Sequence, residues 1–193
     1  MSDLALAVRV NEDVKHIVDA SRQINIVALN ALLTARQAGV RSRGFAVVSR
    51  ELRGLSGQLE TAMLSLDELI SQLTHDLAQS LRDRRLITSI ELAVAEPDPH
   101  PCIWDALTRA MSKHDSIEAA IVVDWQHLDQ ALKVAQRLIA MGGPLARSAK
   151  IEAAYGGGMA PVLRHVAEQV DMTVTQIVER LRKIHGIIDR GAQ

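Results

Sequence analysis

The chain has few aromatic residues and a single cysteine. Aromatic side chains make up 2% of its 193 residues, although 48% are hydrophobic. The core must therefore be built from Ala, Val, Ile and Leu, which fill the narrow seams between long packed helices. Cys102 has no second cysteine to pair with, which excludes an internal disulfide framework and a thiolate-rich metal site.

Long hydrophobic runs and an excess of charge of one sign are also missing. No stretch approaches the roughly 20 uncharged apolar residues that cross a bilayer, and Met1-Ser2-Asp3-Leu4 does not begin a secretion signal. The formal net charge of −1 gives no bulk attraction to nucleic acid or to an acidic membrane. These absences predict a soluble, cytoplasmic protein whose partners are neither nucleic acid nor membranes.

Apolar residues at alternating spacings of three and four predict a long helical hairpin in the first half of the chain. A turn is expected over residues 38–44, where Gly39 and Gly44 can take positive φ angles. The first arm carries the seam Val14, Ile17, Ser21, Ile24, Ala28, Ala31 and Ala35. The returning arm carries Phe45, Val48, Leu52, Leu55, Leu59, Ala62, Leu66, Ile70 and Leu73.

Three prolines, at positions 97, 99 and 101, cannot continue a helix and predict a linker over residues 96–102. The sequence therefore divides into a hairpin over residues 1–95 and a second, degenerate hairpin over residues 103–193 that packs on the first. A third helix is expected from near Ile103, with a break or kink at Gly142-Gly143-Pro144. The chain is expected to reverse at Gly156-Gly157-Gly158.

The second half looks like a degenerate copy of the first. Ala28–Ala35 aligns with Ala146–Ala153, and Gly44–Val48 aligns with Gly158–Val162 after a short deletion in the turn. Chance likeness between alanine-rich helices is the alternative. Two such hairpins predict an all-α fold, a four-helix coiled-coil-like bundle. A single-chain pseudo-dimer and an intermolecular dimer of two copies both satisfy this pattern.

The first predicted turn is flanked by two informative segments. They are Gln23-Ile24-Asn25-Ile26-Val27-Ala28-Leu29-Asn30-Ala31 and Arg43-Gly44-Phe45-Ala46-Val47-Val48, the latter followed by Glu51-Leu52-Arg53. Together they resemble the cytoplasmic hairpin tip of methyl-accepting chemotaxis receptors, and the resemblance covers about residues 14–60. It implies signal transduction by protein contacts, without catalysis, and partners among the chemotaxis histidine kinase, its coupling protein and chemoreceptors.

The resemblance also implies which residues make those contacts, although the apolar ones equally fit a plain bundle core. Gly44 and Phe45 would shape the reversal, and Glu51 and Arg53 would decorate the returning helix. An amide such as Asn25 or Asn30 costs stability in an Ala/Leu-rich helix unless its hydrogen bonds fix register or partner. The expected protein-binding set is Asn25, Ile26, Val27, Asn30, Leu33, Gly44, Phe45, Val47, Val48, Glu51 and Arg53.

The chain departs from the family at charged positions of the turn. The Glu, Ala, Arg and second Glu of the family's E-A-A-R-A-G-E segment are here Thr34, Arg36, Gln37 and Val40. These changes remove charges that would pair between neighbouring tips.

No metal, cofactor or catalytic site is predicted. His114 and Glu118 lie four residues apart, and His100 is near Cys102, but neither pair has the further ligands of a tetrahedral site. Two other functions remain as alternatives. One is a small-molecule sensor that uses the 142–144 kink and the core near Trp125, and the other is a self-assembling structural bundle.

Overall fold

Helices form every regular element of the computed structural model, which describes residues 3–95 and 100–191. The predicted all-α fold is confirmed. None of the described helices is long and apolar enough to cross a membrane. The α-helices are α1 (Asp3–Gln37), α2 (Arg43–Val94), α3 (Pro101–Ala140), α4 (Gly142–Ala154) and α5 (Ala160–Gly191), and short 3-10 helices η1 (Gly39–Ser42) and η2 (Gly157–Met159) follow α1 and α4.

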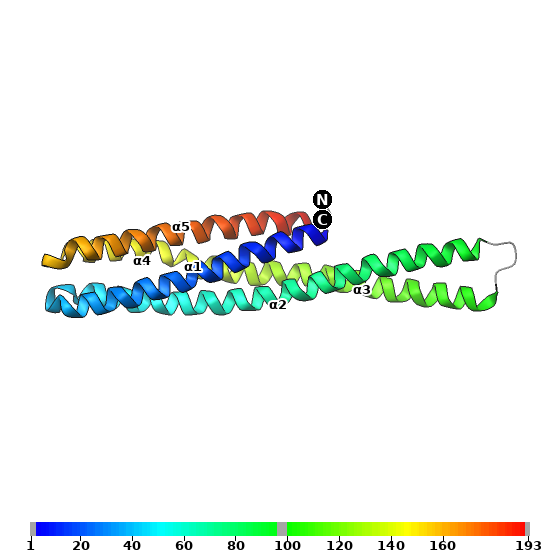
Figure 1. The fold of residues 1–193 in the computed structure, drawn as a ribbon, viewed down its shortest axis with the longest axis horizontal. Coiled ribbons are helices and arrows are strands. Elements are labelled where there is room, and N and C mark those ends of the chain that lie inside the picture. Colours follow the sequence, from blue (N-terminus) through cyan, green and yellow to red (C-terminus); the bar gives the residue numbers. More distant parts are fainter. Residues whose placement is uncertain (1–2, 96–99, 192–193) are drawn as a thin grey trace.

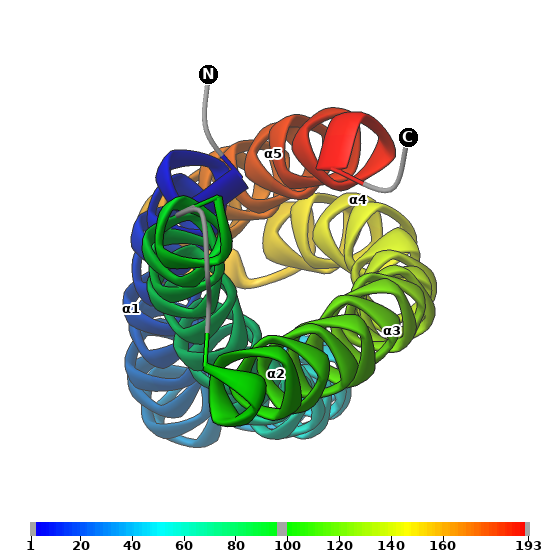
Figure 2. The ribbon, with the colours of Figure 1, turned by 90° about the vertical axis from the view of Figure 1, so that its right-hand side faces the viewer.

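The helices make an up-and-down four-helix bundle within one chain. Viewed from the end, α1, α2, α5 and the consecutive pair α3 and α4 surround a common centre (Figure 2). The start of α1 and the end of α5 lie at the same level along the bundle, and α2 and α3 extend well beyond them (Figure 1). The structure therefore shows the intrachain arrangement, the first of the two that the sequence left open.

The predicted seam of α1 is confirmed, since all seven of its residues are buried. In α2 the prediction is partly wrong. Ser49 and Met63 occupy the buried layers, whereas Val48 and Ala62 are half-buried beside them. The Ser49 hydroxyl donates a 2.8 Å hydrogen bond to the Phe45 carbonyl oxygen one turn earlier. A serine can therefore fill a core position without leaving an unpaired polar group.

One hydrophobic core joins helices from both halves of the chain. Its members include Ile17 of α1, Leu66 of α2, Leu128 of α3 and Ile184 of α5. The division into units at residues 1–95 and 103–193 stays a prediction, because both units contribute to this core. Residues 96–99 of the predicted linker lie outside the described residues, and α3 begins at Pro101 instead of near Ile103.

The two reversals repeat 118 residues apart. Gly39 has a φ of 75° and Gly157 a φ of 59°, and each glycine begins a 3-10 turn. Among the described residues these are the only positive φ angles, so the expectation of a positive φ at Gly44 was wrong. Gly44 lies inside α2 instead.

Buried positions follow the same spacing. Phe45 and Leu163 are counterparts at the start of the returning helices, and both are buried. The short deletion expected in the second turn is therefore wrong, and Met159 is not the counterpart of Phe45. In the outgoing helices, buried Ala28, Ala31 and Ala35 correspond to buried Ala146, Ala149 and Ala153.

The expected break at Gly142 lies one residue earlier, at Met141 between α3 and α4. The core pattern continues across it, because Ile139, Gly142 and Ala146 are all buried at the usual spacing. A Cβ added at Gly142 would lie 3.0 Å from Cγ1 of Val174. The glycine therefore allows α5 to pack closely at this layer.

A carboxyl pair lies where α2 packs on α3. Burial raises the pKa of Asp124 above its ordinary 3.8, and the nearby Asp76 carboxylate raises it further, while His127 opposes the rise. Because the pKa of Asp124 is raised in the folded state, the ionised carboxylate destabilises the fold. This loss of stability grows as the pH rises from the ordinary pKa through the folded-state pKa.

We expect Asp124→Asn to stabilise the protein at pH 7 by about 1 kcal/mol, or roughly 2–4 °C in Tm, because it removes a partly buried charge. The gain should be smaller at pH 4, close to the ordinary pKa of 3.8, because the raised pKa favours the neutral carboxyl of the folded wild type there. Thermal unfolding at both pH values measures it, with the exposed Asp105→Asn as the control. A gain that persists unchanged at pH 4 would contradict this account.

Candidate functional site at the bundle tip

The site that the sequence predicted lies at the closed end of the first hairpin. We call residues 25–54 the first tip. Its inward positions, including Ala31, Ala35 and Phe45, are buried. Its outward positions carry apolar side chains that the bundle leaves in solvent: Ile26 is 59% exposed, Leu33 50% and Val47 48%. Packing within the chain does not account for these three side chains.

The structure divides the eleven predicted residues by burial. Phe45 is buried, and Val27, Gly44 and Val48 are half-buried. Val48 contacts both hydrophobic clusters of the bundle, so its role includes packing. The residues left available to a partner are Asn25, Ile26, Asn30, Leu33, Val47, Glu51 and Arg53.

The two predicted amides have different surroundings. Arg53 Nε donates a 3.2 Å hydrogen bond to Asn25 Oδ1, which ties the returning helix to the outgoing one. This bond supports a register role for Asn25. Asn30 lies five residues further on with its side chain exposed, and its carbonyl oxygen accepts a 3.0 Å bond from the Thr34 hydroxyl. Its amide is free to meet a partner.

A hollow of about 410 Å³ lies beside the Asn25–Arg53 bond. Gly54 and Gly57 form part of its wall, where the absence of side chains keeps the surface low, and Arg50 supplies a second guanidinium. Guanidinium groups bind carboxylates through paired hydrogen bonds. The hollow is thus suited to an acidic side chain of another protein.

The second hairpin contributes half of the tip. We call residues 145–166 the second tip. Phe45 packs in a cluster with Ala149, Ala153, Leu163 and other small residues of α4 and α5. Gly44 faces Glu152 so closely that a Cβ there would overlap the carboxylate. The sequence did not reveal this contact between the two hairpins.

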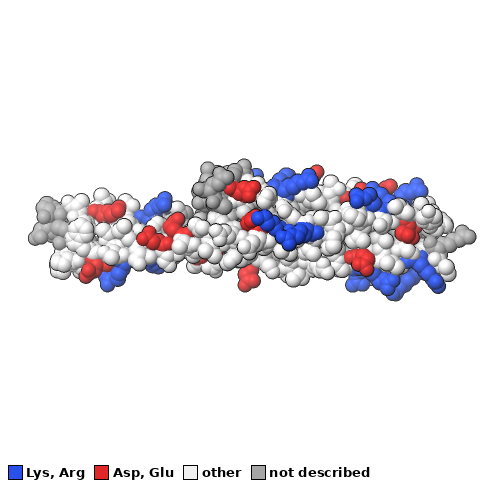
Figure 3. Space-filling view, turned by 180° about the vertical axis from the view of Figure 1, so that it is seen from behind, with Lys and Arg blue, Asp and Glu red and all other residues white. Residues whose placement is uncertain are grey.

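Basic side chains gather at the tip end of the bundle (Figure 3). The first tip exposes several arginines but only Glu51 among its carboxylates. The family's glutamates are replaced in the turn, so basic side chains outnumber acidic ones in the first tip. This field favours an acidic partner surface and speeds its approach at low salt. The exposed arginines are Arg36, Arg43, Arg50 and Arg53.

The residues considered for metal chemistry form pairs only. His114 Nε2 lies 3.8 Å from Glu118 Oε1, and His100 Nδ1 lies 3.1 Å from Cys102 Sγ at the start of α3. His100 Nδ1 also accepts the Cys102 backbone N–H and so caps the helix. Within the described part of the chain, no group of three or more His, Cys, Asp or Glu side chains could hold a metal ion.

Comparison with known proteins finds a family match over the first hairpin. Residues 6–96 match the model of the methyl-accepting chemotaxis protein (MCP) signalling domain. This match includes all eleven predicted contact residues, and it ends two residues after the last residue of α2, Val94. No solved structure matches the chain significantly.

Several chemotaxis receptors share this similarity. The methyl-accepting chemotaxis protein McpS of Pseudomonas putida is 37% identical over 75 residues, which is 37% of this chain and 12% of that protein. The methyl-accepting chemotaxis aspartate transducer of Klebsiella aerogenes is 30% identical over 144 residues, 64% of this chain and 27% of that protein.

The chain thus spans a small part of the length of these relatives. Tip sequence, helical bundle and family match agree. Residues 6–96, just under half of the chain, are therefore similar to the MCP signalling domain and form a chemoreceptor-like helical hairpin.

Proposed function

We propose that the first tip binds a component of the chemotaxis signalling complex, either the histidine kinase or its coupling protein, and thereby regulates kinase output. The observation that carries this proposal is the exposure of Ile26, Leu33 and Val47, three apolar side chains in the segment that resembles the receptor tip. Apolar anchors surrounded by polar groups are typical of protein interfaces.

The charges of the tip support the same proposal. Arg50 and Arg53 border the hollow beside Asn25 and can hold carboxylates of a partner, while the apolar side chains supply contact area. Signalling by such contacts requires no catalytic group. Phe45 and Glu152 lie where the first tip packs on the second. If binding of the partner depends on this packing, the packing regulates kinase output.

Binding of the purified chain to purified coupling protein and kinase tests this proposal. We expect Leu33→Glu to weaken binding at least tenfold, about 1.4 kcal/mol, because it places a charge within the apolar contact. Leu64→Glu is the matched control: Leu64 lies on α2 away from the tip and is 55% exposed, close to the 50% of Leu33. Its affinity should stay within about twofold of wild type.

Titration calorimetry or surface plasmon resonance gives both affinities, after circular dichroism has shown that both variants remain helical. Raising the salt concentration should weaken wild-type binding, because the basic tip then attracts its partner less. If Leu33→Glu and Leu64→Glu bind equally well, or if neither kinase nor coupling protein binds the wild-type chain, the proposal is wrong.

A further inference from the structure

The start of α2 lacks the groups that usually stabilise the first turn of a helix. The first four backbone N–H groups of an α-helix have no partner within the helix, and a side-chain oxygen or a nearby carboxylate normally compensates for this. The first turn of α2 contains no acidic residue, and the preceding Ser42 makes no capping hydrogen bond through its side chain. The Ser42 hydroxyl is buried without a hydrogen-bond partner among the described residues. The local sequence therefore leaves this helix uncapped.

A carboxylate from the second hairpin lies on this first turn. Glu152 of α4 is half-buried, and its carboxylate occupies the space that a Cβ on Gly44 would take. Such a Cβ would lie 2.7 Å from Oε1 of Glu152 and closer still to Oε2. The Cα–Cβ direction in a helix is tilted toward the helix N-terminus, so this space lies on the side of the free N–H groups. The glycine thus admits the carboxylate to the start of α2.

The charge of Glu152 matches the charge of the helix end. The aligned peptide dipoles of a helix give its N-terminus a partial positive charge, which a nearby carboxylate stabilises. Because Glu152 and Gly44 are both half-buried, salt and water screen this interaction less than they would at an exposed helix end. Phe45 and Ala153, the residues that follow Gly44 and Glu152, are buried in one cluster. This packing holds α4 against α2 and keeps the carboxylate at the turn.

At the equivalent position the first hairpin lacks such a carboxylate. At the 118-residue spacing of the two reversals, Thr34 is the counterpart of Glu152, and Val162 is the counterpart of Gly44. Thr34 is uncharged, and its hydroxyl donates to the Asn30 carbonyl oxygen of its own helix. Val162 has a side chain where Gly44 has none. The contact of a carboxylate with a helix start is thus specific to the first tip.

We propose that Glu152 is a positioning residue for the first tip, because its carboxylate stabilises the first turn of α2 and so fixes the contact surface. The amides of Val47 and Val48 donate to carbonyl groups of that turn, and Arg50 and Arg53 follow on the same helix. If the first turn opens, these side chains lose their fixed position. The effect on partner binding rests on the function proposed above, whereas the stabilisation of α2 does not.

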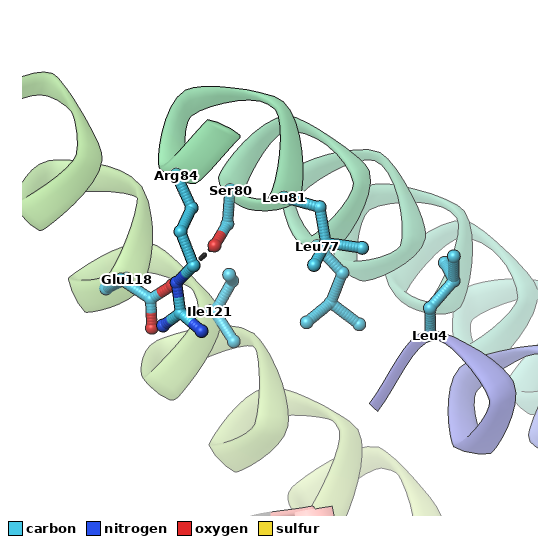
Figure 4. Close-up of a pocket in the computed structure, with 7 residues that line it drawn as sticks. All are labelled: Leu4, Leu77, Ser80, Leu81, Arg84, Glu118 and Ile121. Atoms are coloured by element: carbon cyan, nitrogen blue, oxygen red, sulfur yellow. Dashed lines mark hydrogen bonds between the residues drawn. The ribbon is translucent and has the colours of Figure 1, made fainter. Parts of the chain in front are cut away.

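Hydrogen exchange of the full chain tests the proposal without a partner. Glu152→Gln keeps the size of the side chain and removes its charge. We expect the protection of the amides of residues 47–49 to fall roughly three- to tenfold, because a carboxylate at a partly buried helix end is lost. Glu118→Gln is the control: Glu118 is also half-buried, but it accepts a hydrogen bond from Ser80, well inside α2 (Figure 4). Equal protection of these amides in both variants would overturn the proposal.

A second variant tests the same contact from the side of the helix. Gly44→Ala places a methyl group in the space of the carboxylate, so the flexible Glu152 side chain must move away. In a Glu152→Ala background the methyl group meets no carboxylate, and alanine favours a helix more than glycine does. The change in protection caused by Gly44→Ala should therefore be more favourable in that background than in wild type, by roughly threefold or more. The same change in both backgrounds would contradict the proposal, because the two groups would then not interact.

Affinity for purified coupling protein or kinase tests the positioning role. We expect Glu152→Gln to weaken binding roughly threefold or more. Glu168→Gln should stay within about twofold of wild type, although Glu168 is exposed on α5 and its substitution changes the net charge equally. Undiminished binding by a Glu152→Gln chain that has lost protection would overturn the positioning role. If the wild-type chain binds neither protein, the proposed function fails and the positioning role fails with it, while hydrogen exchange still shows whether Glu152 stabilises α2.

Discussion

Replacing Phe45 with alanine should lower the free energy of unfolding by about 3–5 kcal/mol. Phe45 is 1% exposed, and it is the largest side chain in a tip cluster otherwise made mostly of alanines. The surrounding alanine side chains are too short to fill the space that the ring would leave, so a cavity remains. Chemical denaturation of the full chain measures the loss.

The neighbouring residue Val47 supplies the control. It lies two positions later in the same segment and is about half exposed, so Val47→Ala should change stability by only about 0.5 kcal/mol. Hydrogen exchange should show the Phe45→Ala loss in both tips, because the ring contacts α4 and α5. If the two variants unfold alike, Phe45 is not the residue that joins the hairpins.

The family resemblance named Phe45 from the sequence, but its surroundings were not predictable. Its partners Ala149, Ala153 and Leu163 lie more than a hundred residues away, and the repeat was aligned with Met159 in place of Leu163. Between the two candidates stands Pro161, which lies in the first turn of α5, where a missing backbone N–H costs little.

The helix seam of α1 was predicted well, whereas the predicted seam of α2 missed Ser49 and Met63. The α1 seam was correct at every position, including Ser21, whose hydroxyl donates a 2.8 Å bond to the Ser56 carbonyl oxygen across the hairpin. The error at Ser49 arose because a serine beside Val48 reads as a surface residue. Only the helical geometry shows that its hydroxyl bonds to its own helix and can be buried.

The candidate site was predictable in outline, whereas its accessible surface was not. Periodicity alone cannot separate a buried valine from an exposed one at a helix flank, and the structure shows Val48 packed and Val47 open. Similarly, the sequence assigned Gly44 to the turn, but its lack of a side chain makes room for Glu152 from the other hairpin. Contacts between distant segments decide both cases.

Outside the tip, truncation of Trp125 should strongly destabilise the protein. The surroundings of Trp125 also bear on the small-molecule sensor that the sequence left as an alternative. Its side chain is 2% exposed within the main core. We expect Trp125→Ala to cost about 3–5 kcal/mol, because a large ring is lost from a closely packed layer. The hollow near the helix break, about 420 Å³, is lined by Ile139, Leu181 and neighbouring residues and does not include Trp125.

Phenylalanine at position 125 separates packing from hydrogen bonding. Trp125 Nε1 is buried and has no hydrogen-bond partner among the described residues, and such a group costs about 1–3 kcal/mol. Trp125→Phe removes the unpaired N–H while keeping most of the apolar contact, so its net cost should be below about 1.5 kcal/mol. Denaturant unfolding compares both variants with Val123→Ala, an exposed site on α3. A Phe variant as unstable as the Ala variant would mean that the indole N–H has a partner, as a ligand-binding pocket around Trp125 would require.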